Sequence, residues 1–361
     1  MVLTVRLTWA VQAVAVVDFR PGGAMSDVMQ QIVPISSVKW LGPLGVSLSM
    51  LASWALTGCD ATPGKAPSKP LTAAEQLRRK RLLVHRDSLR ADSIAQAGGQ
   101  LPGAVLPDNR IVAFYGNPLH KSMGILGQYP KDEMLRRLRV QTTEWQQADS
   151  LPVLPALHMT AVIAQRDSGA DGKYRLPLPD STIRRVIRWG QEHKTLVFLD
   201  VQVGLSDLQH ELPPLARYLR LPFVHLGIDP EFSMKSGRRP GTEVGEFDAA
   251  DINYARRFLA RLVSENQLPP KVLVVHRFRQ DMVTNYQNIE LDPRVQIVMH
   301  MDGWGTPSIK RSSYRKFIKK EPVEYAGFKL FFRNDQRPGS RLMKPREVVS
   351  LSPTPLYVQY Q

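Results

Sequence analysis

The chain has 361 residues, of which 43% are hydrophobic, and it carries a formal net charge of +15. This composition excludes an intrinsically disordered protein, because the chain has enough apolar residues to bury the core of one large domain or two smaller ones. The single cysteine, Cys59, excludes internal disulfides and a zinc-finger pattern.

The positive charge is concentrated in two stretches, Arg78 to Arg90 and Lys310 to Arg346. Such stretches favour a polyanionic neighbour, for example an anionic membrane surface, an acidic glycan or nucleic acid. A basic surface that contacts only solvent is the alternative.

The first element in chain order is an apolar segment that ends at the cysteine. Residues 41–56 are mostly apolar and follow a single lysine, and the motif LTGC occupies residues 56–59. The motif resembles the lipobox of a bacterial lipoprotein signal. This resemblance implies cleavage before Cys59, a lipid on its sulfur, and a mature chain anchored at the extracytoplasmic face of the cell membrane. A transmembrane helix is the alternative, although the segment is short for a span and contains proline and glycine.

We therefore expect three segments before the main domain. Residues 1–58 form a leader and signal peptide, and residues 59–70 form a flexible tether rich in Pro, Ser and Lys. Residues 71–99 form a basic amphipathic helix, which opens with the capping-box spacing of Thr72 and Glu75. This helix fits either contact with anionic lipid or a partner, or a solvated position on the domain.

From residue 100 onward, apolar strands alternate with helices. The strands look apolar on both faces, which is typical of parallel strands covered by helices. Eight strand-helix units in residues 100–361 predict a (β/α)8 barrel, and a doubly wound open sheet is the alternative. The first strand-helix turn lacks the GxGxxG and P-loop motifs that would favour an open nucleotide-binding sheet. Strands are predicted at residues 110–116, 151–159, 195–202, 222–231, 271–278, 295–303, 327–335 and 355–361, and helices at 131–148, from Asp180 onward, at 212–219 and at 249–266.

Polar residues stand at nearly every predicted strand end. In a (β/α)8 barrel these ends converge on one open mouth, where the reacting groups gather. The residues are Tyr115, Asn117, His158, Asp200, Gln202, Asp229, Glu231, His276, His300, Asp302, Asn334 and Asp335.

Asp229 and Glu231 are the strongest catalytic candidates among them. Residues i and i+2 of a strand point the same way, with Cα atoms roughly 6.6 Å apart, so both carboxylates should face the mouth. Pro230 between them restricts Asp229 to extended geometry and ends the strand pairing. Two neighbouring carboxylates titrate at different pH values, which leaves one proton donor and one anion near neutral pH. Cleavage of a glycosidic bond requires this division.

The Asp-x-Glu motif at the fourth strand end is similar to that of glycoside hydrolase barrels, particularly family 18 chitinases and family 25 lysozymes. The resemblance implies that Glu231 is the general acid, that Asp229 is its partner, and that the substrate is an N-acetylated sugar polymer. Asp200, Gln202 and Asp302 resemble the additional polar groups of such sites. The motifs FYGNP, MGILG, DVQ, DPEF, MDGWG and GFKLFF together resemble a group of secreted bacterial proteins without an assigned activity.

Aromatic residues near the strand ends could support a sugar ring. Trp304 would offer a stacking platform, to which Tyr115 and Phe232 would add, and packing of Trp304 under a loop is the alternative. We expect His276 to help position the sugar. For the carboxylate pair, the alternative is an ion pair with Arg238 and Arg239 that pins a loop.

Two other functions remain open. His300 and Asp302, with His276, His158 and Asp200, would suit a metal-dependent barrel hydrolase. The chain lacks the HExxH motif and a His-x-His motif on its first strand, so no metal and no cofactor are predicted.

The third function is a non-catalytic surface lipoprotein that binds glycan or a partner. Such a protein would tolerate Glu231→Gln, whereas a glycosidase would lose turnover and keep affinity.

The sequence thus predicts a lipid-anchored glycosidase that acts on a cell-envelope or environmental polysaccharide. The export signal disfavours nucleic acid as a partner, despite the charge. We expect a monomer.

Overall fold

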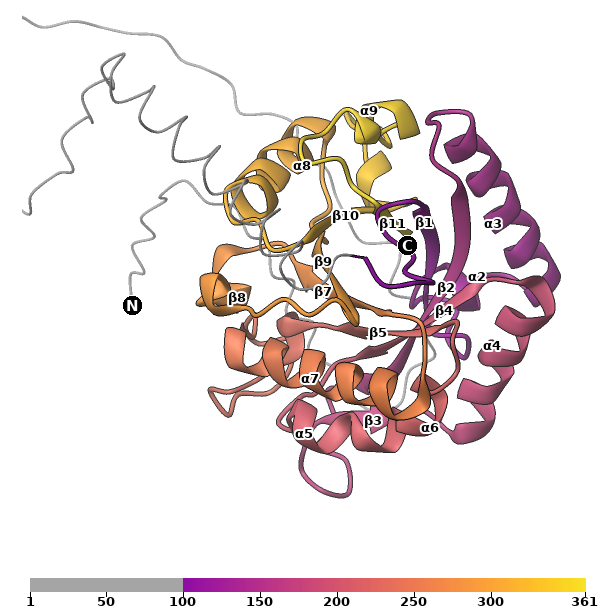
Figure 1. Cartoon of the computed structure of the whole chain (residues 1–361). Coiled ribbons are helices and arrows are strands. Elements are labelled where there is room, and N and C mark those ends of the chain that lie inside the picture. The colour runs from indigo at the N-terminus through magenta and orange to yellow at the C-terminus, as the bar shows by residue number, and fades with distance from the viewer. Residues whose placement is uncertain (1–99) are drawn as a thin grey trace, which may run out of the picture. The chain divides into compact units, whose positions relative to one another are not determined.

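Eight parallel strands form a closed barrel in the computed structural model, which describes residues 100–361 (Figure 1). The barrel closes because β1 pairs with both β2 and β11, in addition to the consecutive pairings of the other strands. This confirms the predicted (β/α)8 barrel and excludes the open sheet. The strands are β1 (Arg110–Gly116), β2 (Val153–Ala164), β4 (Leu196–Val201), β5 (Val224–Ile228), β7 (Lys271–Arg277), β9 (Val295–Met301), β10 (Tyr325–Leu330) and β11 (Tyr357–Tyr360).

Three short strands lie outside the barrel cylinder. β3 (Arg175–Pro177) extends β2 in antiparallel fashion, and β6 (Phe247–Asp248) pairs with β8 (Val283–Thr284). The leader, the lipobox with Cys59, the tether and the basic helix of the sequence prediction all lie outside the described residues.

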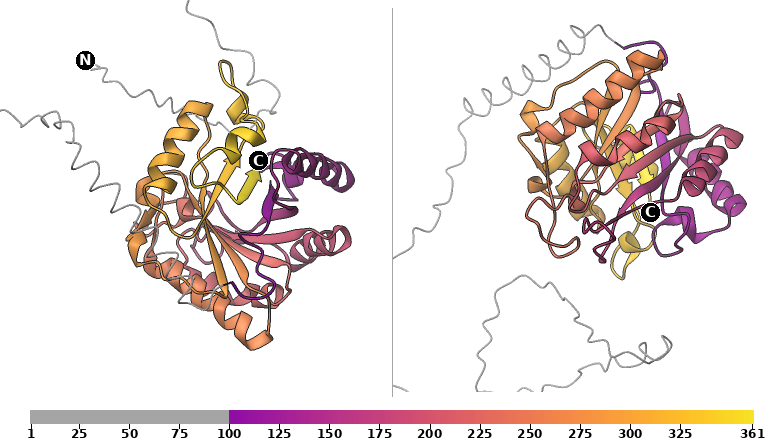
Figure 2. Two further views of the ribbon diagram at one scale, coloured as in Figure 1. Left: turned by 45° about the horizontal axis from the view of Figure 1, so that its top comes forward. Right: turned by 90° about the horizontal axis from the view of Figure 1, so that it is seen from below.

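Helices surround the strands on the outside of the barrel (Figure 2). They are α2 (Ile125–Gln128), α3 (Lys131–Gln146), α4 (Asp180–His193), α5 (Leu208–Glu211), α6 (Ala216–Leu219), α7 (Ala249–Asn266), α8 (Pro307–Tyr314) and α9 (Pro345–Val349). Helix α7 begins and ends where the sequence predicts, because Asp248 caps it by accepting a hydrogen bond from Ala250 N and the chain turns left-handed at Gln267.

The predicted helix at 212–219 is divided in the structure. Pro213–Leu215 form a 3-10 turn before α6, because consecutive prolines at 213 and 214 lack the N–H groups that a regular helix would need.

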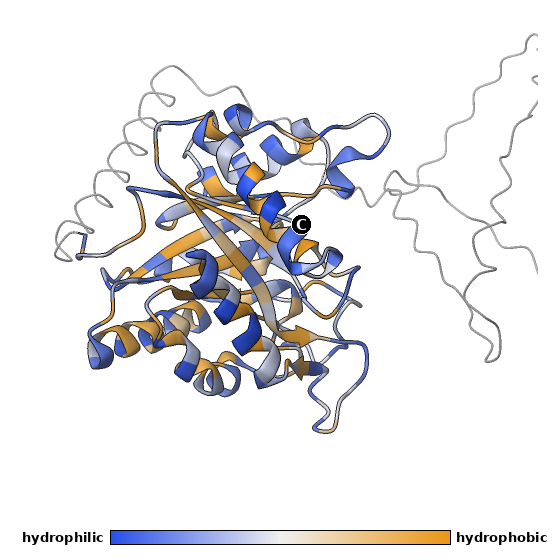
Figure 3. Ribbon diagram, turned by 90° about the vertical axis from the view of Figure 1, so that its right-hand side faces the viewer, coloured by the Kyte–Doolittle hydropathy of each residue, from blue (hydrophilic) through white to orange (hydrophobic). Residues whose placement is uncertain are grey.

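The barrel interior is apolar only in its lower half, toward the amino ends of the strands. Ile111, Ala113, Phe198, Val272 and Val274 pack there in a small inner cluster, while a larger apolar layer fills the space between strands and helices. Figure 3 shows strands that are mainly hydrophobic, surrounded by helices that carry both hydrophobic and hydrophilic residues.

The upper interior is polar, which corrects the expectation that the strands are apolar on both faces. Successive inward positions, two residues apart, carry the polar side chains toward the mouth. The buried polar residues of this upper half are His158, Asp200, His276, His300, Lys329 and Gln359. His225 lies lower, within the inner apolar cluster, where its ring lies beside Phe198 and it accepts a hydrogen bond from Val272 N.

Within the described residues, no helix combines the length and the apolar character needed to cross a membrane.

Candidate active site

A pocket of about 510 Å³ opens where the carboxyl ends of the barrel strands converge. Its lining combines acids with amides, a lysine and aromatic rings, as expected of a site that binds a polar ligand with flat apolar faces. The lining residues that this account uses are Tyr115, Thr160, Gln202, Asp229, Glu231, Phe232, Phe278, Asp302, Trp304, Lys329, Phe331 and Gln361.

The structure places Asp229 and Glu231 in this pocket by a different local geometry from the predicted one. Strand β5 ends at Ile228, and Pro230–Phe232 form a 3-10 turn capped by Asp229. Asp229 Oδ1 accepts a hydrogen bond from Glu231 N at 3.1 Å, and Asp229 Oδ2 accepts one from Gln202 Nε2 at 3.1 Å. The two carboxylates therefore face the same pocket because of the turn. The prediction that they do so as residues i and i+2 of one extended strand is wrong.

Their surroundings shift the pKa values of both groups upward. Burial, together with the carboxylates of Asp229 and Asp302, raises the pKa of Glu231 to about 8. Burial and the negative charges of Asp200 and Asp302 raise the pKa of Asp229 to about 6, although the His276 imidazolium opposes this. At neutral pH the pair therefore holds one proton, mainly on Glu231.

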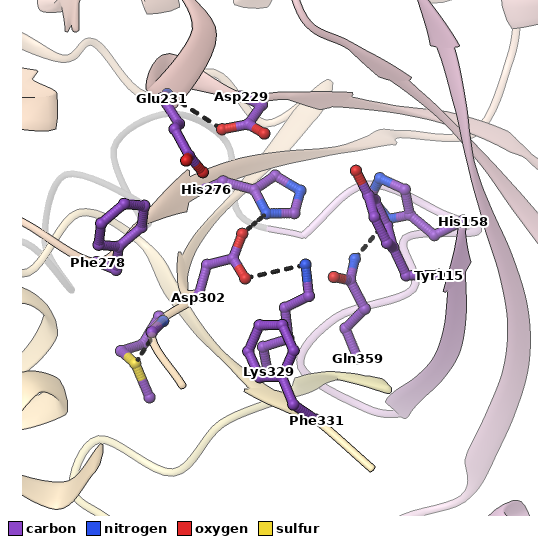
Figure 4. Close-up of polar contacts among 12 residues, drawn as sticks. Tyr115, His158, Asp229, Glu231, His276, Phe278, Asp302, Lys329, Phe331 and Gln359 are labelled. Carbon is purple, nitrogen blue, oxygen red and sulfur yellow. Dashed lines mark hydrogen bonds and ion pairs between the residues drawn. The ribbon is translucent and has the colours of Figure 1, made fainter. Parts of the chain in front are cut away.

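Asp302 follows β9, lines the same pocket and stays ionised. Its carboxylate contacts His276 Nδ1 at 2.6 Å and Lys329 Nζ at 2.9 Å, as Figure 4 shows. Burial alone would raise the pKa of Asp302, but these two cations outweigh it and hold the pKa below its usual range. The pocket thus contains a protonated carboxyl group and a fixed carboxylate.

Asp200 and His276 lie one layer below the pocket, so the structure does not support their predicted direct contact with a sugar. Both side chains are almost fully buried, and neither lines the pocket. Asp200 Oδ2 accepts a hydrogen bond from the Tyr115 hydroxyl at 3.2 Å, and His276 links Asp200 to Asp302. Burial disfavours the imidazolium of His276, but Asp200 and Asp302 outweigh this and raise its pKa to about 10. The two residues support the pocket from beneath.

His158, Asp200 and His276 are the described residues that could hold a metal ion. Asp200 Oδ1 lies 3.4 Å from His158 Nε2 and 3.5 Å from His276 Nε2, and the three atoms all lie within 4.8 Å of one another. None of these atoms has a hydrogen-bond partner within usual geometry. A metal here would lie beneath the pocket, since no member of the group lines it.

Trp304 is the most exposed of the predicted sugar contacts. Its side chain is 52% exposed at the pocket rim, and the Arg337 guanidinium stacks 4.4 Å from its ring centroid. Packing of Trp304 under a loop is therefore not observed. Phe232 also lines the pocket.

The alternative ion pair of the carboxylates with Arg238 and Arg239 is not observed either. Arg238 Nη1 contacts Glu243 at 3.4 Å, and neither arginine pairs with Asp229 or Glu231 among residues 100–361. An ion pair with these arginines therefore does not explain why Asp229 and Glu231 stand at this position.

Three of the remaining strand-end residues, Asn117, His300 and Asp335, contribute to the structure of the barrel and its loops. Asn117 accepts a hydrogen bond from Leu119 N, and His300 is buried inside the barrel. Asp335 accepts hydrogen bonds from Gly305 N, Phe331 N and Lys310 Nζ, which fixes the loop after β10.

Sequence reasoning missed Lys329, Phe278 and Phe331. A signal for Lys329 exists: it lies within the apolar run GFKLFF, two positions before Phe331, on the inward face of its strand. The pairing of Lys329 with Asp302 could not be read from the sequence, because it depends on how neighbouring strands align.

The fold and mouth together define the class of this protein: a (β/α)8 barrel whose mouth pocket holds three carboxylates. No protein-family model matches the chain, and no curated protein matches it significantly. Among solved structures, the chain is similar to a GH5 xyloglucan-specific endo-β-1,4-glucanase from a metagenomic library, determined in complex with cellotriose. That similarity has 10% sequence identity and a TM-score of 0.31, and covers 62% of this chain and 76% of the other. Such a TM-score is too low to assign an activity, so the functional argument rests on the residues of this chain.

Proposed function

We propose that this protein is a glycoside hydrolase that acts on a cell-envelope or environmental polysaccharide. The observation that carries the proposal is that three carboxyl groups, those of Glu231, Asp229 and Asp302, line one mouth pocket. The raised pKa of Glu231 favours a proton on this group near neutral pH, while Lys329 and His276 keep Asp302 anionic. A glycosidase needs a protonated acid beside the leaving oxygen and an anion beside the developing positive charge.

Glu231 is the proton donor in this proposal. It lies at the pocket wall, and the turn that follows β5 fixes its backbone through the hydrogen bond from Glu231 N to Asp229. Glu231 would donate its proton to the glycosidic oxygen as the bond from that oxygen to the anomeric carbon breaks. Water would then add to this carbon and return a proton to Glu231. Gln202 donates a hydrogen bond to Asp229 and would hold the Asp229 carboxylate in place beside Glu231 during this step.

Asp229 and Asp302 supply negative charge in the pocket, Asp229 from the same turn as Glu231 and Asp302 from the residue after β9. Lys329 and His276 hold the Asp302 carboxylate in one orientation, as expected of a group preorganised to stabilise an oxocarbenium-like transition state. Trp304 and Phe232 provide aromatic surfaces for sugar faces. Tyr115 lines the pocket, but it is only 7% exposed and Lys329 Nζ lies 4.1 Å from its ring centroid, so Tyr115 offers a sugar little ring surface.

The test is to incubate the full chain and its Glu231→Gln variant with peptidoglycan, chitin-type, neutral and acidic polysaccharides, and to measure the reducing ends released. We expect release from at least one polysaccharide by the wild type and its loss in the variant, with binding retained. Glu265→Gln is the matched control, because Glu265 is an exposed residue of α7, in the last turn of the helix. Binding to a polysaccharide without any release, unchanged in Glu231→Gln, would leave a glycan-binding barrel.

A metal-dependent hydrolase is the second candidate. It is favoured by three buried atoms of His158, Asp200 and His276 that lack a hydrogen bond of usual geometry and lie within 4.8 Å of one another, as metal ligands do. The protein purified without chelator should contain about one equivalent of divalent metal if this candidate holds, and Asp200→Asn should remove it. Metal-free protein with full activity would exclude it.

The membrane anchor is also part of the proposed function. It rests on the LTGC motif at residues 56–59 and the tether that follows. Anchoring would keep the barrel at the extracytoplasmic face, beside envelope polysaccharides.

A further inference from the structure

A second cavity, of about 750 Å³, lies beside the mouth pocket. Ser122, Phe331 and Gln361 line both cavities, so the two share a wall. Arg337 lines the second cavity while its guanidinium stacks on Trp304 of the mouth pocket. A chain-like ligand could therefore run from one cavity into the other.

The second cavity is strongly basic. Five cationic side chains line it and no acidic side chain does: Lys121, Arg136, Arg137, Arg333 and Arg337. Arg136 and Arg137 share one acid, Glu133, at 2.7 Å each, so that group of three keeps a net positive charge. Lys121, Arg333 and Arg337 have no acidic partner in the part of the chain that the structure describes.

The floor of the same cavity is aromatic and apolar. Phe114, Phe331, Phe332 and Ile125 contribute to it, beneath the exposed cations. An apolar floor suits the face of a sugar ring, and arginines at the rim suit carboxylate or phosphate groups on that ring. The positive charge of the cavity therefore favours an anionic occupant.

We propose that this cavity is a subsite for an anionic glycan, and that the polysaccharide cleaved at the mouth carries carboxylate or phosphate groups. The proposal rests on the proposed function and narrows its substrate class. Lys121 and Arg333 bind the anionic groups of the sugar units next to the cleavage point.

The test compares two double variants of the full chain, both in the Glu231→Gln background so that the ligand is not consumed. Lys121→Gln/Arg333→Gln removes two exposed charges from the subsite. Arg257→Gln/Arg261→Gln removes two exposed charges from α7 and is the matched control. Each variant has the same net charge, so a difference between them reports position and not total charge.

The ligands are two anionic glycans, polygalacturonate and a phosphate-bearing mannan, each with its matched neutral form: polygalacturonate with its carboxyl groups reduced to alcohols, and the mannan without its phosphate groups. We expect the unsubstituted subsite to bind at least one of the two anionic polymers about 10-fold more tightly than the neutral form of the same polymer. The subsite double variant should lose about 10-fold in affinity for that polymer, and the α7 double variant should not. The preferred polymer identifies the anionic group as carboxylate or phosphate.

Equal binding of charged and neutral polymers, or equal loss in both double variants, would overturn the proposal. The proposal would also be overturned if anionic phospholipid vesicles or a single-stranded oligonucleotide bound more tightly than both anionic polymers, and if this binding were lost in the subsite double variant but not in the α7 double variant.

Cleavage is measured separately, with the same double variants made in the chain that keeps Glu231. Glu231-dependent cleavage of a neutral glycan that is unaffected by Lys121→Gln/Arg333→Gln in that background would overturn the subsite and leave the glycosidase intact. Subsite-dependent binding without any Glu231-dependent cleavage would instead overturn the glycosidase.

Discussion

At the scale of single residues, the proposed catalysis depends on the proton that Glu231 holds. The proposed reaction requires Glu231 protonated and Asp229 ionised, and the pKa values of these groups are raised to about 8 and about 6, respectively. The rate constant kcat/KM should therefore rise with pH near 6 and fall near 8, in a bell-shaped profile. Initial rates between pH 4 and 10 measure it, and a plateau that continues to pH 10 would show that no acid of this kind is needed.

The raised pKa of Glu231 also predicts that the stability of the folded protein depends on pH. Because the pKa of Glu231 is raised in the folded state to about 8, folding is opposed increasingly as pH rises from the unfolded pKa near 4.5 toward 8. Glutamine does not titrate, so Glu231→Gln should melt at a higher temperature than the wild type, by a margin that is larger at pH 8 than at pH 5. Thermal melts at both values check this.

If the difference in melting temperature between Glu231→Gln and the wild type were the same at both pH values, Glu231 would lie in a solvated environment. Glu265→Gln, at an exposed position, should show no such pH dependence and serves as the control.

At the scale of elements, β5 and the turn after it position the acid pair. Gly227 pairs in register with Asp200 of β4, and a Cβ atom at Gly227 would lie 2.5 Å from Asp200 Oδ1 and 2.6 Å from His158 Nε2. Gly227→Ala should therefore destabilise the fold by about 1–3 kcal/mol, because the interior cannot accommodate the added methyl group.

The measurement is the free energy of unfolding from denaturant titration. Gly237→Ala is the comparison, because Gly237 has a φ of 79° with open space around it and should cost only backbone strain of about 1 kcal/mol. A smaller loss at Gly227 than at Gly237 would show that the space beneath the pocket is not closely packed.

The elements were largely predictable, and the contacts between them were not. Apolar runs bounded by turn residues located the eight barrel strands, and Asp248 located the start of α7. The end of β5 was misplaced because the cap at Asp229 competes with strand extension. Ion pairs such as Lys329 with Asp302 depend on strand register, which a single sequence does not contain.

At the scale of the whole molecule, closure of the barrel brings β1 next to β11 and assembles the mouth from strands far apart in sequence. The strand count predicted this closure. The polar interior was harder to predict, because a histidine within an apolar strand has the same local sequence context whether it faces the helices or the barrel axis.

The membrane anchor is a prediction of the same scale. A bacterial host that makes the full chain should yield it in the membrane fraction, with a mass at Cys59 that includes a diacylglycerol thioether. Cys59→Ser should abolish both the lipid and the processing. Equal distribution of the two forms between membrane and soluble fractions would contradict the lipobox assignment.

The most direct test of the central claim compares two leaving groups. On a polysaccharide that the wild type cleaves, Glu231→Gln should lose about 10²–10⁴-fold in kcat, because a sugar alkoxide needs protonation to leave. On the nitrophenyl glycoside of the same sugar, whose leaving group needs little protonation, the loss should be far smaller. Equal losses on both substrates, or none on either, would contradict the assignment of Glu231 as the general acid.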